Sequence, residues 1–220
     1  MYINLHTHHQ SFNSDTRSIV NLSLNQLRNK EVPSTYFSVG LHPWDMAKYK
    51  SNDLAIMLDY GTNKNCIAIG ECGLDKSKGS SLNEQITLFI KQVHISETLQ
   101  LPLIIHCVRA YSEIIKFKKD LKPKQPWIFH AYNGSKETTM QALRHGFYFS
   151  LGEALNHPNS KAKASIHHIP HDHLFFETDD KPQLGIKSIY QTAAQLLDIE
   201  IQALQLITEN NFKLLFNENY

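Results

Sequence analysis

The sequence predicts an α/β protein: a compact TIM-type (β/α)8 barrel with an incomplete outer ring of helices. Short apolar runs of strand type recur eight times along the chain, and several are hydrophobic throughout, as parallel strands buried on both faces are. Helical patterns lie between the later runs, which favours right-handed βαβ units and a closed sheet. The expected strands are residues 2–5, 18–22, 36–41, 66–70, 102–105, 127–129, 147–151 and 174–177.

The clearest helix is expected at residues 82–99, where Ser81 and Glu84 have capping-box spacing and apolar residues recur on one face. Further helices are expected at residues 111–118, 136–145 and 159–166, and two or three more between residues 186 and 216. About a dozen residues separate the second and third strands. This is little room for a full helix, so the outer ring should be incomplete there.

Length and composition are those of one globular domain, which we expect to span residues 1–220. A net charge of +1 gives no electrostatic reason by itself to expect nucleic-acid binding. No apolar run approaches the roughly 20 residues that span a bilayer, and the first residues do not resemble a signal peptide. We therefore expect a cytoplasmic protein with no membrane association and no obligate protein partner.

Four histidines and two carboxylates stand at the carboxyl ends of predicted strands. Each alone is often a core residue or a helix cap, but in a barrel these strand ends converge on one mouth. Two of the histidines are at positions i and i+2 of one strand, so both rings face the same way. Imidazole and carboxylate ligands suit Zn²⁺, Mn²⁺ or Fe²⁺, and carboxylates also admit Mg²⁺. The six predicted metal ligands are His6, His8, Glu71, His106, His130 and Asp179.

A series of motifs surrounds these residues and runs in order along nearly the whole chain. It resembles the TatD family of metal-dependent hydrolases, within the amidohydrolase-like barrel group. After the opening His-x-His strand, the matching segments are Gly40-Leu-His-Pro43, Gly70-Glu-Cys-Gly-Leu-Asp75, the helix with Gln85, Phe89 and Gln92, the strand ending at His106, His130-Ala-Tyr-Asn-Gly-Ser135, Glu177-Thr-Asp179, and the late helix from Asn211 to Phe216.

The resemblance implies a centre of two divalent metal ions. It assigns Glu71 to both ions as a bridge, and it implies cleavage of phosphodiester bonds, in DNA or a small phosphodiester, by a hydroxide between the metals. Asp179 would be the general base, which makes Asp179 and Glu71 the expected catalytic residues. His6, His8 and Asp179 complete the first metal's ligands, and His106 and His130 complete the second's.

The chain departs from the family pattern in the loops that would choose a substrate. Asn4 stands where the family often has aspartate, Val108 stands at a usual arginine, and Asp180-Lys-Pro182 replaces the usual continuation after Glu-Thr-Asp. Two alternatives therefore stay open. One is a hydrolase of C–N or carboxyl-ester bonds on the same barrel. Such an enzyme would use a carboxylated lysine as its metal bridge, and the presence of Glu71 in that place argues against it. The other is a non-catalytic metal-binding scaffold.

Several other residues are candidates with a structural alternative. Three residues are candidate substrate contacts: His42, Arg109 and Lys136. The alternative for His42 is a turn residue, and the alternative for the two cations is simple solvation. Trp44 and Tyr132 could stack bases or pack at the rim. The histidine-rich residues 167–173 precede the eighth strand, so we expect a solvated loop away from the mouth. The three cysteines, Cys66, Cys72 and Cys107, should be reduced, buried thiols.

Overall fold

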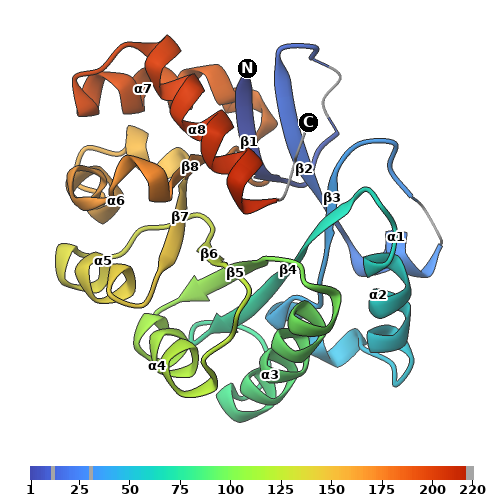
Figure 1. The fold of residues 1–220 in the computed structure, drawn as a ribbon. Coiled ribbons are helices and arrows are strands. Elements are labelled where there is room, and N and C mark those ends of the chain that lie inside the picture. Colours follow the sequence, from blue (N-terminus) through green and yellow to red (C-terminus); the bar gives the residue numbers. More distant parts are fainter. Residues whose placement is uncertain (11–12, 30–31, 217–220) are drawn as a thin grey trace. The chain divides into compact units, whose positions relative to one another are not determined.

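The computed structural model describes residues 1–10, 13–29 and 32–216. The chain divides into two compact units, one of Met1–Ile19 with Phe129–Tyr220 and one of Val20–Ile128. The eight strands follow one another in chain order in a single sheet, and the pairs from β2 to β5 and the pair β7–β8 are parallel. Eight parallel strands with intervening helices confirm the predicted α/β fold (Figure 1).

The elements agree with the prediction in order and mostly in extent. The strands are β1 (Tyr2–Thr7), β2 (Thr16–Leu22), β3 (Phe37–Val39), β4 (Cys66–Asp75), β5 (Leu103–Val108), β6 (Trp127–Phe129), β7 (Phe147–Leu151) and β8 (Leu174–Phe176). The α-helices are α1 (Leu24–Arg28), α2 (Asp53–Gly61), α3 (Leu82–Leu99), α4 (Tyr111–Leu121), α5 (Lys136–Leu143), α6 (Lys161–Ser165), α7 (Ile186–Leu197) and α8 (Ile201–Leu215). The short connection between β2 and β3 contains only the five-residue helix α1 among its described residues, as the expected incomplete outer ring requires.

Two expected strand ends and one missing helix need correction. β4 continues to Asp75 and β5 to Val108, and these two residues are register partners. Glu71 and His106 therefore lie within their strands and not at their ends. The glycines of the Gly70–Asp75 segment suggested the end of a strand. Gly73 instead allows β4 and β5 to lie side by side, because a Cβ there would lie 1.9 Å from the carbonyl oxygen of His106. Helix α2 escaped prediction because it is short and its N-cap, Asn52, makes no capping hydrogen bond.

In the Val20–Ile128 unit, α3 packs along β4 (Figure 1). Its capping box is confirmed, because the Ser81 side chain accepts from the Glu84 backbone and the Glu84 carboxylate accepts from the Ser81 backbone N–H. The two glutamines of the family motif tie this helix to the sheet. Gln92 exchanges two hydrogen bonds with the backbone of Leu41, and Gln85 exchanges two with the backbone of Asp75.

In the other unit, α7 and α8 pack against β1 and β8 (Figure 1). The core here is largely aromatic: Phe129 stacks on Phe147 with ring centroids 4.5 Å apart, and Tyr190 meets Phe176 edge-on at 4.8 Å. The Tyr190 hydroxyl also accepts from the backbone of Ile3, which fixes the helices to the first strand. The strand that carries His6 is thereby held from its buried side.

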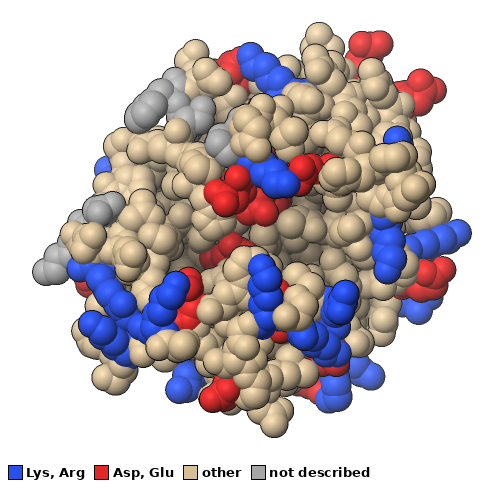
Figure 2. All heavy atoms as spheres, turned by 180° about the vertical axis from the view of Figure 1, so that it is seen from behind, with Lys and Arg blue, Asp and Glu red and all other residues tan. Residues whose placement is uncertain are grey.

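Charged side chains are mixed on the surface. On the face shown in Figure 2, Lys and Arg side chains lie among Asp and Glu side chains. This agrees with the near-zero net charge. Among the described residues, the helices lack the combination of length and hydropathy needed to cross a bilayer.

Candidate metal centre

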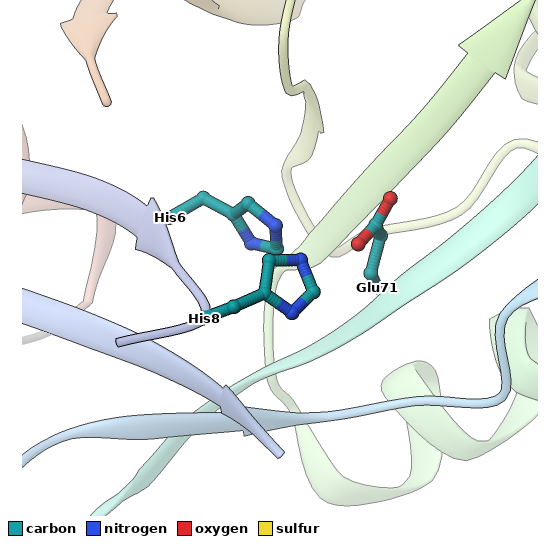
Figure 3. Close-up of side chains that lie close together, drawn as sticks. All are labelled: His6, His8 and Glu71. Carbon is teal, nitrogen blue, oxygen red and sulfur yellow. The ribbon is translucent and has the colours of Figure 1, made fainter. Parts of the chain in front are cut away.

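His6 and His8 lie at the carboxyl end of β1, with their rings on the same side of the chain (Figure 3). The backbone of Asp179 is clamped between them, because its N–H donates to the carbonyl of His6 at 3.1 Å and its carbonyl accepts from the N–H of His8 at 3.2 Å. Asp179 has a φ of +50°, a left-handed conformation that aspartate tolerates better than most residues. The clamp brings its Oδ1 to 3.6 Å from His6 Nε2 and 3.4 Å from His8 Nε2.

His130 joins this cluster from the end of β6, with its ring centroid 4.4 Å from that of His6. Its Nδ1 donates to Glu177 Oε1 at 3.1 Å, and the same oxygen accepts from the backbone of Ala131. Burial raises the pKa of Asp179, but the imidazoles of His6 and His8 beside it outweigh burial, and that pKa lies well below its usual range. The cluster therefore presents an ionised carboxylate beside three imidazoles, and the His130 ring is held in place through its Nδ1.

Glu71 and two imidazoles form a second cluster in the Val20–Ile128 unit. Glu71 projects from β4 (Figure 3), and its Oε1 lies 2.8 Å from His106 Nδ1 and 3.1 Å from His42 Nε2. His42 Nδ1 accepts from the backbone N–H of Trp44, so its Nε2 carries the proton donated to Glu71. The backbone N–H of Glu71 donates to the Asn21 side chain at 2.7 Å. Glu71 is thus held on both its backbone and its carboxylate.

Asp75 is the carboxylate behind this second cluster. Its Oδ2 lies 3.2 Å from His106 Nε2 and accepts from the indole N–H of Trp44 at 2.6 Å. Burial raises the pKa of Asp75, but hydrogen bonds from Ser77 and Trp44 outweigh it and lower the pKa to about 2. Because an ionised carboxylate only accepts, His106 Nε2 donates to Asp75, while its Nδ1 lies 2.8 Å from Glu71 Oε1.

Both clusters have the donor set of a divalent metal site. The ligating atoms of His6, His130 and Asp179 lie within 4.8 Å of one another, as do those of a second trio, His42, Glu71 and His106. In the Glu71 cluster two imidazole nitrogens lie close to one carboxylate oxygen, and divalent metal ions bind such a combination of nitrogen and oxygen ligands. Ligating histidines also typically donate their other nitrogen to a carboxylate, as His130 and His106 do here. The residues therefore fit the predicted metals.

Sequence reasoning missed the supporting roles of Glu177 and Asp75, although both belong to motifs it had marked. The signal was available, since a fully buried carboxylate needs a partner. Sequence also left the Asn4 substitution unexplained. The Asn4 amide both donates to Thr178 Oγ1 and accepts from the Thr178 backbone, a pairing for which an ionised aspartate lacks the donor.

The candidate substrate contacts lie in different settings. Arg109 and Lys136 are exposed, the first at the end of β5 with a φ of +55° and the second at the start of α5. Their substrate role stays a prediction. Tyr132 is fully buried and pairs with Thr139, so it packs in the core and does not stack bases. Trp44, in contrast, is exposed.

The histidine-rich segment and the cysteines lie outside both clusters. Residues 166–168 and 171–173 form two short 3-10 turns before β8, and His173 bonds to the carbonyl of Phe147. Among the described residues, the segment joins none of the candidate metal groups. All three cysteines are free, and burial raises the pKa of the Cys66 thiol to about 12. Cys66 and Cys72 are buried and Cys107 partly so, which largely confirms the prediction.

Sequence and structure comparisons agree on the relatives of this chain. The family model "TatD related DNase" matches residues 6–217. The chain is 28% identical over 205 residues to the uncharacterized metal-dependent hydrolase YabD of Bacillus subtilis, a match covering 86% of this chain and 80% of that protein. It is 26% identical over 124 residues to the 3'-5' ssDNA/RNA exonuclease TatD of Escherichia coli, covering 56% of this chain and 48% of that protein.

The crystal structure of YJJV, a TatD homologue from Escherichia coli, superposes with a TM-score of 0.86 at 21% identity, covering 99% of this chain and 98% of that one. This likeness establishes the fold as the predicted TIM-type barrel. Fold and donor clusters together define a metal-dependent hydrolase. The chain belongs to the TatD-related DNase family.

Proposed function

We propose that this protein is a two-metal phosphodiesterase that acts on nucleic-acid ends or small phosphodiesters. The observation that carries the proposal is Glu71, a buried carboxylate held between His42 and His106 within 3.1 Å. In this proposal the six predicted ligands would hold the two ions, with Glu71 shared, as the match to the TatD family implies. The relative from Escherichia coli that is named as a 3'-5' ssDNA/RNA exonuclease supports the choice of substrate.

The chain's own residues have distinct roles in this reaction. Two bound divalent ions would lower the pKa of a water molecule and polarise a phosphoryl oxygen. Asp179, which is ionised, accepts the proton of the attacking water. Glu177 and Asp75 keep His130 and His106 oriented through their far nitrogens. Arg109 and Lys136 would pair with phosphate oxygens.

The proposal competes with hydrolysis of C–N or carboxyl-ester bonds and with a metal-binding scaffold. A panel of single-stranded DNA, dinucleotides, aryl phosphodiesters, carboxyl esters and amides, assayed with Mg²⁺, Mn²⁺ and Zn²⁺, separates the three. Turnover of phosphodiesters supports the proposal, and turnover of esters or amides alone supports the first competitor. Bound metal without any turnover supports the scaffold.

The cytoplasmic location stays a prediction.

Glu71→Ala tests the shared ligand directly. We expect this variant to bind fewer metal ions per chain and to lose nearly all hydrolysis, measured by metal analysis of the purified protein and by the substrate panel. Asp59→Ala, which removes an exposed carboxylate of α2, is the matched control and should keep both properties. Unchanged metal content and turnover in the Glu71 variant would overturn the assignment.

A further inference from the structure

Trp44 is a large aromatic side chain that remains exposed beside the Glu71 cluster. Its relative exposure is 46%. The indole ring lies edge-on to His42 and to His106, with centroid distances of 4.8 and 5.4 Å. Both imidazoles contact Glu71. An indole here therefore adjoins the proposed metal ligands, and tryptophan is enriched where proteins bind partners and ligands.

Hydrogen bonds hold the indole in place. Its N–H donates to Asp75 Oδ2 at 2.6 Å, and Asp75 is 1% exposed. The backbone N–H of Trp44 donates to His42 Nδ1 at 3.1 Å. Because the ring is anchored by its edge, its faces do not need packing to stay oriented. A ring oriented in advance loses little conformational freedom when a flat ligand stacks on it.

Lys78 supplies a positive charge at the same ring. Its Nζ lies 4.2 Å from the Trp44 ring centroid, which is a cation–π geometry. The backbone N–H of Lys78 donates to Asp75 Oδ1 at 3.2 Å. Gly79 follows with a φ of +88°, and a Cβ there would lie 2.5 Å from the carbonyl oxygen of Pro43. The glycine thus lets the lysine loop approach the segment that carries the indole.

We propose that Trp44 and Lys78 form a nucleotide platform, on which the indole stacks a nucleobase and the lysine pairs with the adjoining phosphate. The lysine's flexible stem lets its ammonium move from the ring to the phosphate. The substrate class is single-stranded nucleic acid, because a base inside a duplex already has both faces stacked. This inference rests on the proposed function, since the platform serves a phosphodiester held beside Glu71.

Tryptophan fluorescence tests the platform without catalysis. The chain has two tryptophans, and the other, Trp127, is fully buried. With a chelator present, a single-stranded oligonucleotide should quench the emission of Trp44, and an oligonucleotide of the same length with an abasic end should quench it less. Trp44→Phe should abolish this base-dependent quenching, while Leu58→Ala, which removes an exposed leucine of α2, should leave it unchanged.

Affinity measurements separate the two members of the platform. Trp44→Ala should weaken binding of the base-containing oligonucleotide on the order of 10-fold or more and should barely affect the abasic one, with Trp44→Phe intermediate. Lys78→Ala should weaken both equally and reduce the salt dependence of binding. In the metal-loaded enzyme, Trp44→Ala should raise KM with little change in kcat.

The outcomes distinguish the platform from the hydrolase. Phosphodiester hydrolysis without base-dependent quenching would overturn the platform and leave the proposed function intact. Base-dependent quenching without hydrolysis of any phosphodiester would support the platform and contradict the proposed function. Equal loss of affinity for both oligonucleotides in Trp44→Ala would also overturn stacking.

Discussion

The two imidazole–carboxylate clusters use similar residues but are built differently. Around Asp179 the residue is fixed through its backbone, and its Oδ1 stands 3.6 Å from His6 Nε2 and 3.4 Å from His8 Nε2. Around Glu71 the carboxylate is in hydrogen-bond contact with its imidazoles, at 2.8 and 3.1 Å. The Glu71 carboxylate therefore lies closer to its imidazole neighbours than the Asp179 carboxylate lies to His6 and His8.

The supporting carboxylates of the two clusters, Glu177 and Asp75, differ in the hydrogen bonds that they accept. Glu177 accepts from His130 and from one backbone N–H. Asp75 accepts from His106, Trp44, Ser77 and the Lys78 backbone. The Glu71 cluster is thus connected to an exposed loop and an aromatic ring, and the Asp179 cluster to the sheet.

Asp179→Asn should produce the largest effect. It keeps the side chain's shape but removes the ionised oxygen, so turnover of a phosphodiester should fall by a factor on the order of 10² to 10⁴. Steady-state kinetics at saturating metal measure this. Asp59→Asn is the matched control, because Asp59 is an exposed carboxylate of α2, and this variant should turn over normally. Full activity in the Asp179 variant would remove the proposed base.

Asp75→Asn and Glu177→Gln compare the two supporting carboxylates. Each should weaken metal binding about 10- to 100-fold, because the histidine it orients is freed. Only Asp75→Asn should also shift the fluorescence of Trp44, since that carboxylate holds the indole. Calorimetric titration with Mn²⁺ or Zn²⁺ and emission spectra test both statements. The same spectral shift in both variants would show that the two clusters are not built differently.

Asp53→Asn should have the smallest effect on metals and a clear effect on stability. Asp53 is a buried carboxylate of the Val20–Ile128 unit that pairs with Arg28 at 2.7 Å and accepts from the Lys50 backbone. The variant should lose about 1.5–3 kcal/mol of unfolding free energy at pH 7, measured in urea. Metal affinity should not change, which separates a structural carboxylate from a ligating one.

This stability difference should depend on pH. Burial raises the pKa of Asp53, but the Arg28 guanidinium outweighs it, and the pKa is lowered on folding. A lowered pKa contributes stability that is complete above the unfolded value, near 4, and is lost as the pH falls through the folded value. The two proteins should therefore converge in stability below about pH 4. A difference that grows on acidification would contradict the pairing.

Sequence predicted the fold and pointed to candidate ligands, because both are read from local patterns. A buried apolar run followed by histidine or carboxylate is visible in Leu103–Val108 without any knowledge of its neighbours. The support of those ligands was not visible, because it depends on distant pairs such as His130 with Glu177. The extent of β4 was missed for a related reason: its glycines look like a strand end until β5 is placed beside them.

The clamp between β1 and Asp179 has a consequence for the timing of synthesis. His6 is made 173 positions before Asp179, the residue to whose backbone it is hydrogen-bonded. At bacterial or eukaryotic rates of translation this separates the two by roughly 10 s or more. During that interval the growing chain contains His6 and His8 without the backbone hydrogen bonds that Asp179 makes to them. A chain that is interrupted before residue 179 therefore lacks this clamp on β1.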